Sequence, residues 1–320
     1  QIFGRDGKHI PRQTLCDWAL NAAELLAPIA ACQMALSRAG PVMQLDDTPV
    51  QCQGGRGESN FQAYLWSFVN PEVNGVAYRF TPGRSKELIA AELGDFTGNL
   101  VGDGYSGNRA AAKIVSESTG KPIHMGGCWS HVIRKFRDAR KEAPSMAELF
   151  CVDIGKLFDI EREADDAELS PAERVACRQQ KSKPILMDIY SRARTCLGSY
   201  SDSGSLIKAI GYIRGQYRPL RRFLEDGLVP IHNNACERAI RPIAVGRRNW
   251  LFAGSVRGGH AAAVIYTLIE CCRQADVNML SYLEDVLVRV ATHPAKLVHQ
   301  LLPANWVKRF APAAPELALA

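Results

Sequence analysis

Hydrophobic positions in the first third of the chain change from a helical to a strand-like spacing. Apolar residues recur every three or four positions between Leu15 and Ile29, which predicts a helix over 13–38 that Gly40 and Pro41 end. Three shorter runs, rich in β-branched and aromatic residues and separated by turn residues, follow at 42–50, 63–69 and 76–80. Because short strands joined by turns pair with their neighbours, these runs predict an antiparallel meander.

Helical and strand-like segments then alternate. The predicted order is a helix over 85–93, a strand over 99–103, a helix over 106–118, a strand over 122–127 and a basic helix over 130–142. A meander followed by alternating strands and helices is typical of an α/β fold with a mixed sheet and flanking helices.

The rest of the chain is predicted to be helical. Residues 145–217 are rich in charge, with apolar residues at helical spacing, so we interpret them as an all-helical insertion. Residues 260–301 predict two more amphipathic helices before a loose tail. The expected organisation is an N-terminal helical segment (1–40), the first part of an α/β core (41–143), the helical insertion (144–215), the last part of the core with Glu237 (216–262), and C-terminal helices with a tail (263–320).

Positive charge is concentrated in one region. The composition, 47% hydrophobic and 22% charged, is ordinary for a globular protein and argues against broad disorder. Between residues 211 and 260 there are nine arginines, no lysine and three acids, a surplus equal to the net charge of +6 of the whole chain. Such a surplus predicts contact with a polyanion such as nucleic acid, although a solvated basic face has the same composition.

The cysteines and the apolar segments indicate the cellular compartment in which the chain is expected. Ten cysteines are scattered without a CxxC pair or a preceding signal peptide, which favours a reduced cytoplasmic chain over a disulfide framework. The apolar run 261–272 is too short to span a bilayer, so no membrane partner is expected. Gln1 in place of a methionine indicates a fragment or processed chain that lacks N-terminal modules.

Three acids occupy positions suited to divalent metal ions. Asp46 ends one apolar strand, and Asp103 ends another just before Gly104, where a backbone can approach closely. Glu237 lies on a predicted short helix that ends at Pro242. Two-metal phosphoryl transfer uses such acids, and hard cations prefer carboxylate oxygens. Each acid alone is more typical of a turn or cap, but together with the arginines they indicate a metal-dependent enzyme acting on a polyanion.

Four strings in order along the chain resemble the IS66 family of insertion-sequence transposases: LDDTPV, GDGYSGN, GGCWSHVIRKF and PIHNNACERAIRPIAVGRRNWLFAGS. The resemblance runs from about residue 1 to about residue 308 and includes LLPANW near the end. The last long string is highly specific, whereas LDDTPV alone is loose. The resemblance implies an RNase H-like core with a DDE triad, interrupted by helices between the second aspartate and the glutamate.

Carried over from the family, the triad falls on Asp46, Asp103 and Glu237, which would bind two Mg²⁺ ions, with Mn²⁺ as a substitute. The family usually has Asp-Glu-Thr-Pro where this chain has Asp-Asp-Thr-Pro at 46–49. Because successive strand residues face opposite sides, only one of Asp46 and Asp47 can reach the metals. We choose Asp46 and keep Asp47 as the fallback.

Basic side chains around the triad are candidates for DNA contact. They are, with one aromatic residue, Arg134, Lys135, Arg238, Arg241, Arg247, Arg248 and Trp250. The two arginines after Glu237 share its helical face and either contact phosphates or form local ion pairs. Arg247 and Arg248, placed on a loop beyond that helix, are better phosphate candidates. Trp250 either stacks on an unpaired base or belongs to the core.

Two polar residues have alternative roles. Asn233 lies four residues before Glu237 and either orients its carboxylate or only caps the helix. His131 either lies near the scissile phosphate or begins the basic helix. Cys128 and His131 have the form of half a zinc site, but no second ligand pair follows them, so zinc is not expected.

The sequence and its resemblance together predict a DNA transposase, which uses metal-activated water at the transposon ends and then transfers the freed 3′-OH to target DNA. An RNase H-like nuclease without strand transfer and a catalytically silent DNA-binding protein are the alternatives. The expected partner is double-stranded DNA, both the transposon ends and the target. Because two ends must be held, a homodimer or larger synaptic complex is expected. The resemblance adds accessory proteins encoded by the element, and the expected location is cytoplasmic, on the nucleoid.

Overall fold

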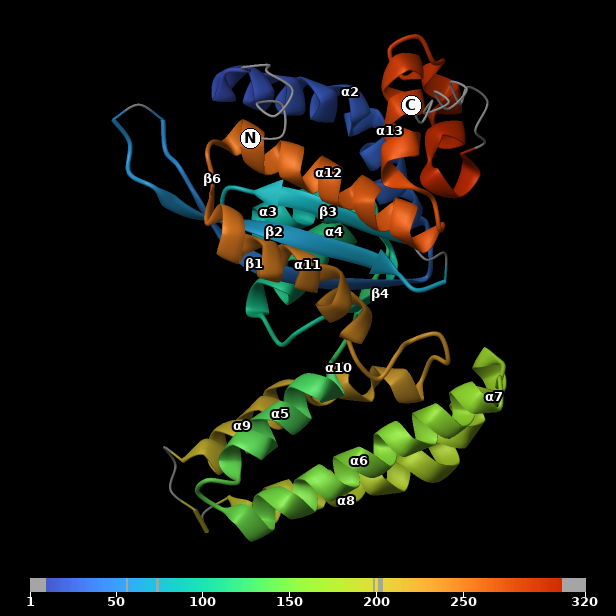
Figure 1. Cartoon of the computed structure of the whole chain (residues 1–320). Coiled ribbons are helices and arrows are strands. Elements are labelled where there is room, and N and C mark those ends of the chain that lie inside the picture. Colours follow the sequence, from blue (N-terminus) through green and yellow to red (C-terminus); the bar gives the residue numbers. More distant parts are fainter. Residues whose placement is uncertain (1–9, 56, 73–74, 198, 201–203, 307–320) are drawn as a thin grey trace, which may run out of the picture. The chain divides into compact units, whose positions relative to one another are not determined.

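The computed structural model describes residues 10–55, 57–72, 75–197, 199–200 and 204–306 (Figure 1). The strands are β1 (Val42–Cys52), β2 (Phe61–Asn70), β3 (Gly75–Thr81), β4 (Gly98–Val101), β5 (Ile123–Gly126) and β6 (Phe252–Ala253). The helices are α2 (Arg12–Ala39), α3 (Lys86–Leu93), α4 (Ser106–Thr119), α5 (Trp129–Ala139), α6 (Pro144–Asp166), α7 (Pro171–Cys177), η1 (Arg178–Ser182), α8 (Lys183–Cys196), α9 (Ser205–Gly215), α10 (Tyr217–Arg221), η2 (Arg222–Leu224), α11 (Asn234–Trp250), α12 (Val256–Gln274), α13 (Met279–Arg289), η3 (Ala295–Leu301) and η4 (Pro303–Asn305).

The strands of the described chain form one mixed sheet in the order β3-β2-β1-β4-β5, with β6 paired to β1. The β2 and β3 strands are antiparallel, from Tyr64 opposite Thr81 to Asn70 opposite Gly75. The β4 strand is parallel to both of its neighbours. The predicted α/β fold with a mixed sheet and flanking helices is therefore confirmed. The change from meander to parallel strands falls where the sequence begins to alternate between strand and helix.

The chain divides into two compact units. Within the described residues, the first unit takes the chain up to Ala39, residues 47–84 and everything from Ala239 onward, whereas the second unit takes 40–46 and 85–238. The β1 strand is shared, with its first residues in the second unit and its remainder in the first. All three candidate acids, at positions 46, 103 and 237, lie in the second unit.

In the first unit, α2 and α12 pack against β2 and β3 (Figure 1). The Ser255 hydroxyl begins α12 by accepting the Gly258 N–H at 3.0 Å, which satisfies a backbone group that a helix start leaves open. A separate apolar cluster is formed by α2, α12, α13 and η3, with Leu26, Leu268 and Val286 buried in it. The apolar residues whose spacing predicts α2 and α12 are thus the ones that the two helices bury in this cluster.

The α2 helix is long and apolar enough to cross a membrane by length and composition, with 33% of the tested window buried. Its buried residues, Leu26 and Ile29 among them, contribute to the core of the first unit. All ten cysteines are free thiols, as their spacing predicts.

The second unit has its core between the parallel strands and a group of helices. Val42 of β1 and Val101 of β4 are buried in one cluster with Trp129 and Phe136 of α5. The Phe136 ring stacks on that of Phe150 in α6, with 4.2 Å between ring centroids. The α5 helix packs on α6 and α9, and α6 packs on α8 (Figure 1). The stretch predicted to be helical therefore folds as helices that share this core.

The predicted end of the Glu237 helix at Pro242 is wrong, because α11 continues to Trp250. A proline lacks the N–H that would bond to the carbonyl four residues earlier, here that of Arg238, and this normally ends or kinks a helix. Pro242 is exposed, so water can reach the backbone there, and Ile240 and Ile243 are buried on either side of it. Arg247 and Arg248 consequently lie on the last turn of α11 and not on a loop.

Candidate active site

The two candidate aspartates lie on neighbouring parallel segments of the sheet. The expected place of Asp46 at the end of a strand is wrong, because β1 continues past it to Cys52, whereas Asp103 lies two residues beyond the end of β4. The β1 and β4 strands pair in a register that sets Val42 opposite Asn99 and Gln44 opposite Val101. Continued by two residues, this register places Asp46 abreast of Asp103. Side chains alternate along a strand, so both acids face the side on which the buried Val42 and Val101 meet α5. The register therefore sets two residues far apart in sequence next to each other, one within β1 and one just after β4.

A buried asparagine connects the start of α11 to β1. Asn233, fully buried just before α11, donates from Nδ2 to the Leu45 carbonyl at 2.9 Å, and Leu45 immediately precedes Asp46. Its Oδ1 has no hydrogen-bond partner among the described residues. Asn233 therefore neither caps α11 through that oxygen nor bonds to Glu237, the two roles expected of it. Its contact instead holds the first turn of α11, which carries Glu237, beside the middle of β1.

The segment before α11 is held by the start of α5. The Asn233 N–H donates to Cys128 Sγ at 3.2 Å. The Trp129 N–H donates to the Ile231 carbonyl at 3.0 Å, and the indole N–H donates to the Leu220 carbonyl at 2.9 Å. Cys128 and Trp129 are both fully buried, so these bonds are shielded from water. Cys128 and Trp129 thus hold the segment before α11 in place, a role that the sequence analysis missed. Their place in the family string GGCWSHVIRKF was the signal that could have pointed to them.

Glu237 is flanked by two basic side chains of α5. Its Oε2 accepts a hydrogen bond from Arg134 Nη2 at 3.2 Å, and its Oε1 lies 3.7 Å from His131 Nδ1. Burial lowers the pKa of His131, and the nearby Arg134 also lowers it, whereas the charges of Glu237 and Asp103 act in the opposite direction. Glu237 is therefore flanked by the imidazole of His131 on one oxygen and by the guanidinium group of Arg134 on the other.

Asp103 is fixed by its own loop. Its Oδ1 accepts the Tyr105 N–H at 3.0 Å and the Asn108 side-chain N–H at 3.1 Å. Gly104 leaves room for α9, since a Cβ there would come within 2.7 Å of the Tyr212 ring. Burial and the charge of Asp103 raise the pKa of Tyr212 to about 12. Lys135 lies over the same ring, with 4.7 Å from Nζ to the centroid. Tyr212 is another site residue that the sequence did not point to.

The alternative first acid, Asp47, is engaged elsewhere. Its carboxylate accepts hydrogen bonds from Nε and Nη2 of Arg84, at 3.0 and 2.6 Å. The Asp47 side chain is 4% exposed, so this ion pair is shielded from solvent. A metal ion at Asp47 would have to displace Arg84 from a buried carboxylate, whereas the Glu237 carboxylate is 28% exposed and can change its partner at lower cost.

Two sets of side chains could hold a divalent ion. Asp46, Asp103 and Glu237 offer only carboxylate oxygens, and Glu237 Oε1 is buried without a hydrogen-bond partner among the described residues. Magnesium prefers such hard oxygen ligands. Among the described residues, the set whose ligand atoms lie within 4.8 Å of one another is Cys128, His131 and Glu237. Burial raises the pKa of the Cys128 thiol, however, and a metal needs the thiolate. The donor chemistry fits magnesium on the carboxylates better than zinc on the mixed set.

Comparison with known sequences identifies the family of the chain. The sequence model of the transposase IS66 family matches residues 1–261. The chain belongs to this family.

Three proteins of Sinorhizobium fredii (strain NBRC 101917 / NGR234) are similar to this IS66 family member over most of its length. The uncharacterized protein y4hP is 33% identical over 95% of the chain, y4qI is 31% identical over 95%, and y4jD is 30% identical over 96%. The chain spans only 58–61% of the length of these relatives.

The remaining DNA-contact candidates lie along α11. Arg238, Arg241 and Arg248 are exposed, so their guanidinium groups can reach a polyanion. Arg247 donates to the Pro49 carbonyl. The partly buried Trp250 indole donates to the Tyr266 hydroxyl at 3.2 Å, and this contact favours a core position for its ring over base stacking.

Replacing Asn233 with alanine is expected to destabilise this family member by about 1–3 kcal/mol, because the buried Leu45 carbonyl loses its donor. Urea denaturation followed by circular dichroism measures the change. Asn234→Ala is the matched control, since that side chain makes one part-buried hydrogen bond to Ser130 at 2.9 Å. Equal losses of unfolding free energy in the two variants would show that the contact with Leu45 stabilises the fold no more than the contact with Ser130 does.

Proposed function

We propose that this chain carries the catalytic centre of a transposase, which cuts DNA at the ends of a mobile element and joins them to target DNA. The observation that carries the proposal is the register of β1 and β4, which when continued sets Asp46 abreast of Asp103, together with the Asn233 contact that holds the start of the Glu237 helix against β1. Membership of the transposase family supports DNA as the substrate. Because the chain spans part of its relatives' length, other segments would supply recognition of the element ends.

The three carboxylates would hold two Mg²⁺ ions, for which Mn²⁺ would substitute. When bound, the ions supply an activated water and neutralise charge that develops on the phosphate. In the first step the water oxygen attacks phosphorus, the bond from phosphorus to the 3′ oxygen breaks, and that oxygen takes a proton to give a free 3′-OH. In the second step this 3′ oxygen loses its proton and attacks a target phosphorus, and the displaced 3′ oxygen of the target strand takes up a proton to become a hydroxyl. No bond forms between protein and DNA.

Basic residues would position the DNA for this chemistry. Arg134 and Lys135 lie on α5 beside the carboxylates, and each already has a local partner, Glu237 and the Tyr212 ring. Held in this way, their side chains present fixed positive charge next to the acids. The exposed arginines of α11 would add contacts to phosphates that do not depend on sequence. We further propose that two copies or more hold the paired element ends, with help from accessory proteins of the element.

Strand joining with pre-cleaved ends tests the proposal. The chain is mixed with Mg²⁺, a labelled duplex that ends in a free 3′-OH and a supercoiled plasmid target. Joined products are expected from the wild type and not from Glu237→Gln. Pre-cleaved ends bypass the first step, so joining does not depend on cleavage.

The outcome separates the candidate functions. Nicked plasmid without joined label would identify a nuclease that does not transfer strands. Neither product, with no heat of Mg²⁺ or Mn²⁺ binding by calorimetry, would identify a catalytically silent DNA-binding protein. Either result contradicts the proposal.

A further inference from the structure

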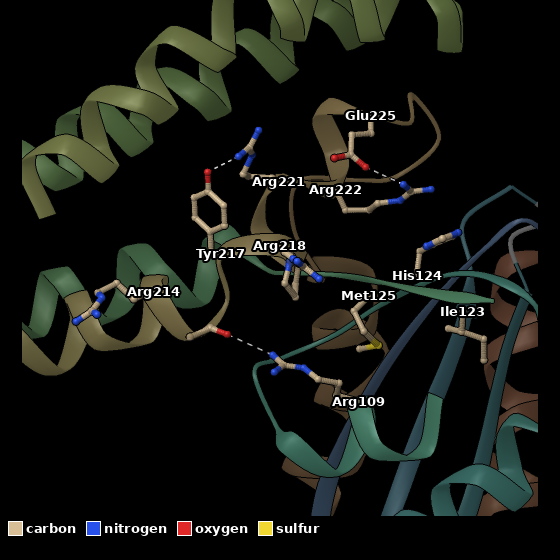
Figure 2. A pocket seen from close by; sticks show the side chains of 12 residues that line it. Arg109, Ile123, His124, Met125, Arg214, Tyr217, Arg218, Arg221, Arg222 and Glu225 are labelled. Atoms are coloured by element: carbon tan, nitrogen blue, oxygen red, sulfur yellow. Dashed lines mark hydrogen bonds and ion pairs between the residues drawn. The ribbon is translucent and has the colours of Figure 1, made fainter. Parts of the chain in front are cut away.

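A second basic site lies in the same unit, apart from the three acids. It is a cavity of about 780 Å³ that α4, β5, α9, α10 and η2 surround (Figure 2). Its wall carries five arginines: Arg109, Arg214, Arg218, Arg221 and Arg222. One acid, Glu225, shares this wall. Five guanidinium groups against one carboxylate make a strongly positive cavity, which only an anion would neutralise.

Three of the arginines are held by the protein. Arg222 donates to Asn99 Oδ1 at 2.7 Å and to Glu225 at 2.8 Å, so the only acid of the wall is already paired. Arg221 lies over the Tyr217 ring, 4.9 Å from the centroid. Arg109 donates to the Gly215 carbonyl at 3.3 Å, which connects α4 to the end of α9. These contacts fix the wall without neutralising it.

The other two arginines are available to a ligand. Arg214 and Arg218 are exposed, and neither forms an ion pair with any described residue. Figure 2 shows Arg218 between Arg109 and Arg222, and Arg214 to one side of them on α9. An exposed guanidinium presents several N–H donors in a plane, the geometry that fits phosphate oxygens.

The aromatic lining does not favour recognition of bases. The Tyr217 ring packs edge-on against Tyr190, with 4.7 Å between centroids, and its other contact is Arg221. A ring that is occupied in this way is a poor stacking platform. The cavity therefore suits the backbone of a nucleic acid and not its bases.

We propose that this arginine cavity binds the phosphodiester backbone of DNA, as a contact separate from the carboxylate site. The cavity itself indicates an anionic ligand, and the choice of DNA as that anion rests on the proposed function. None of its five arginines is among the contacts expected from the sequence. The salt dependence of binding reports such contacts directly, because each neutralised phosphate releases counterions.

The test compares two double variants of the full chain in the absence of divalent metal. Arg214→Gln/Arg218→Gln removes the two unpaired cavity arginines. Lys183→Gln/Arg194→Gln removes the same charge from exposed positions on α8. Fluorescence anisotropy with a labelled duplex and a labelled single strand, both of arbitrary sequence, gives the dissociation constant over a range of salt concentrations. Unchanged thermal midpoints establish that both variants fold.

The cavity variant is expected to lose about 0.9 in the slope of log K against log salt for each duplex contact removed, and so up to about 1.8 in all. For the single strand the expected loss is about 0.7 per contact. The α8 variant should keep the wild-type slope. Equal losses in the two variants, no loss in either, or no DNA binding by the wild type would overturn the proposal. Because metal is absent, failure of the catalytic proposal would leave this result unchanged.

Discussion

Replacing Glu237 with glutamine is expected to slow both cleavage and strand joining by on the order of 10³-fold, or about 4 kcal/mol. Glutamine keeps the size of the side chain and can still accept a hydrogen bond from Arg134. It removes the negative charge that would help to hold the two ions. Turnover of labelled element ends at saturating Mg²⁺ measures the effect, and excess Mn²⁺ is expected to recover only part of it.

Two control variants show whether the loss belongs to the proposed site. Glu117→Gln removes an acid that is 66% exposed on α4 in the same unit, and its activity should equal that of the wild type. Cys128→Ser removes the sulfur of the mixed Cys-His-Glu cluster, and it should retain metal-dependent turnover if the carboxylates hold the ions. A Glu237→Gln protein that cleaves at the wild-type rate would contradict the proposed role of Glu237 in holding the metal ions.

Replacing Glu161 with glutamine is expected to destabilise the fold by about 3–5 kcal/mol. Glu161 accepts hydrogen bonds from Arg178 Nε at 2.8 Å and Nη2 at 2.6 Å. Arg178 is 1% exposed, and its remaining donors bond to the Phe223 and Asp226 carbonyls. The substitution leaves a buried guanidinium without its counter-charge. The free energy of unfolding from urea titration measures the loss.

The matched control is an ion pair of the same kind at the surface. Asp159→Asn on α6 breaks the contact with Arg162, whose side chain is 68% exposed, and should cost less than about 1 kcal/mol. The double variant Glu161→Gln/Arg178→Met removes both buried partners and should recover much of the single variant's loss. A single variant as stable as Asp159→Asn would mean that the buried pair contributes little.

The order of helices and strands could be predicted from hydrophobic spacing. The helical repeat around Leu26 and Ile29 and the short runs of the meander reflect burial on one face, which local sequence records. The continuation of α11 past Pro242 could not be predicted in this way. The helix continues where Ile240 and Ile243 are buried on either side of the proline and where the distant Tyr78 hydroxyl donates to the Ala239 carbonyl. A local rule about proline therefore failed where tertiary packing decided the outcome.

The candidate site came partly from chemistry and partly from resemblance. Strand-end positions drew attention to Asp46 and Asp103, but only family resemblance separated them from ordinary turn residues. The contact of Asn233 with Leu45 joins residues 188 positions apart, and no local pattern records it. The same holds for the arginine cavity. Its members contribute to the arginine surplus at 211–260, yet composition does not say which of these arginines share a wall.

Anomalous diffraction from a crystal of the chain soaked in Mn²⁺, measured at the manganese absorption edge, would show which side chains hold the ions. We expect anomalous density in contact with carboxylate oxygens of Asp46, Asp103 and Glu237 together. Density held by Cys128, His131 and Glu237 in their place, or three acids that share no ion at saturating Mn²⁺, would contradict it.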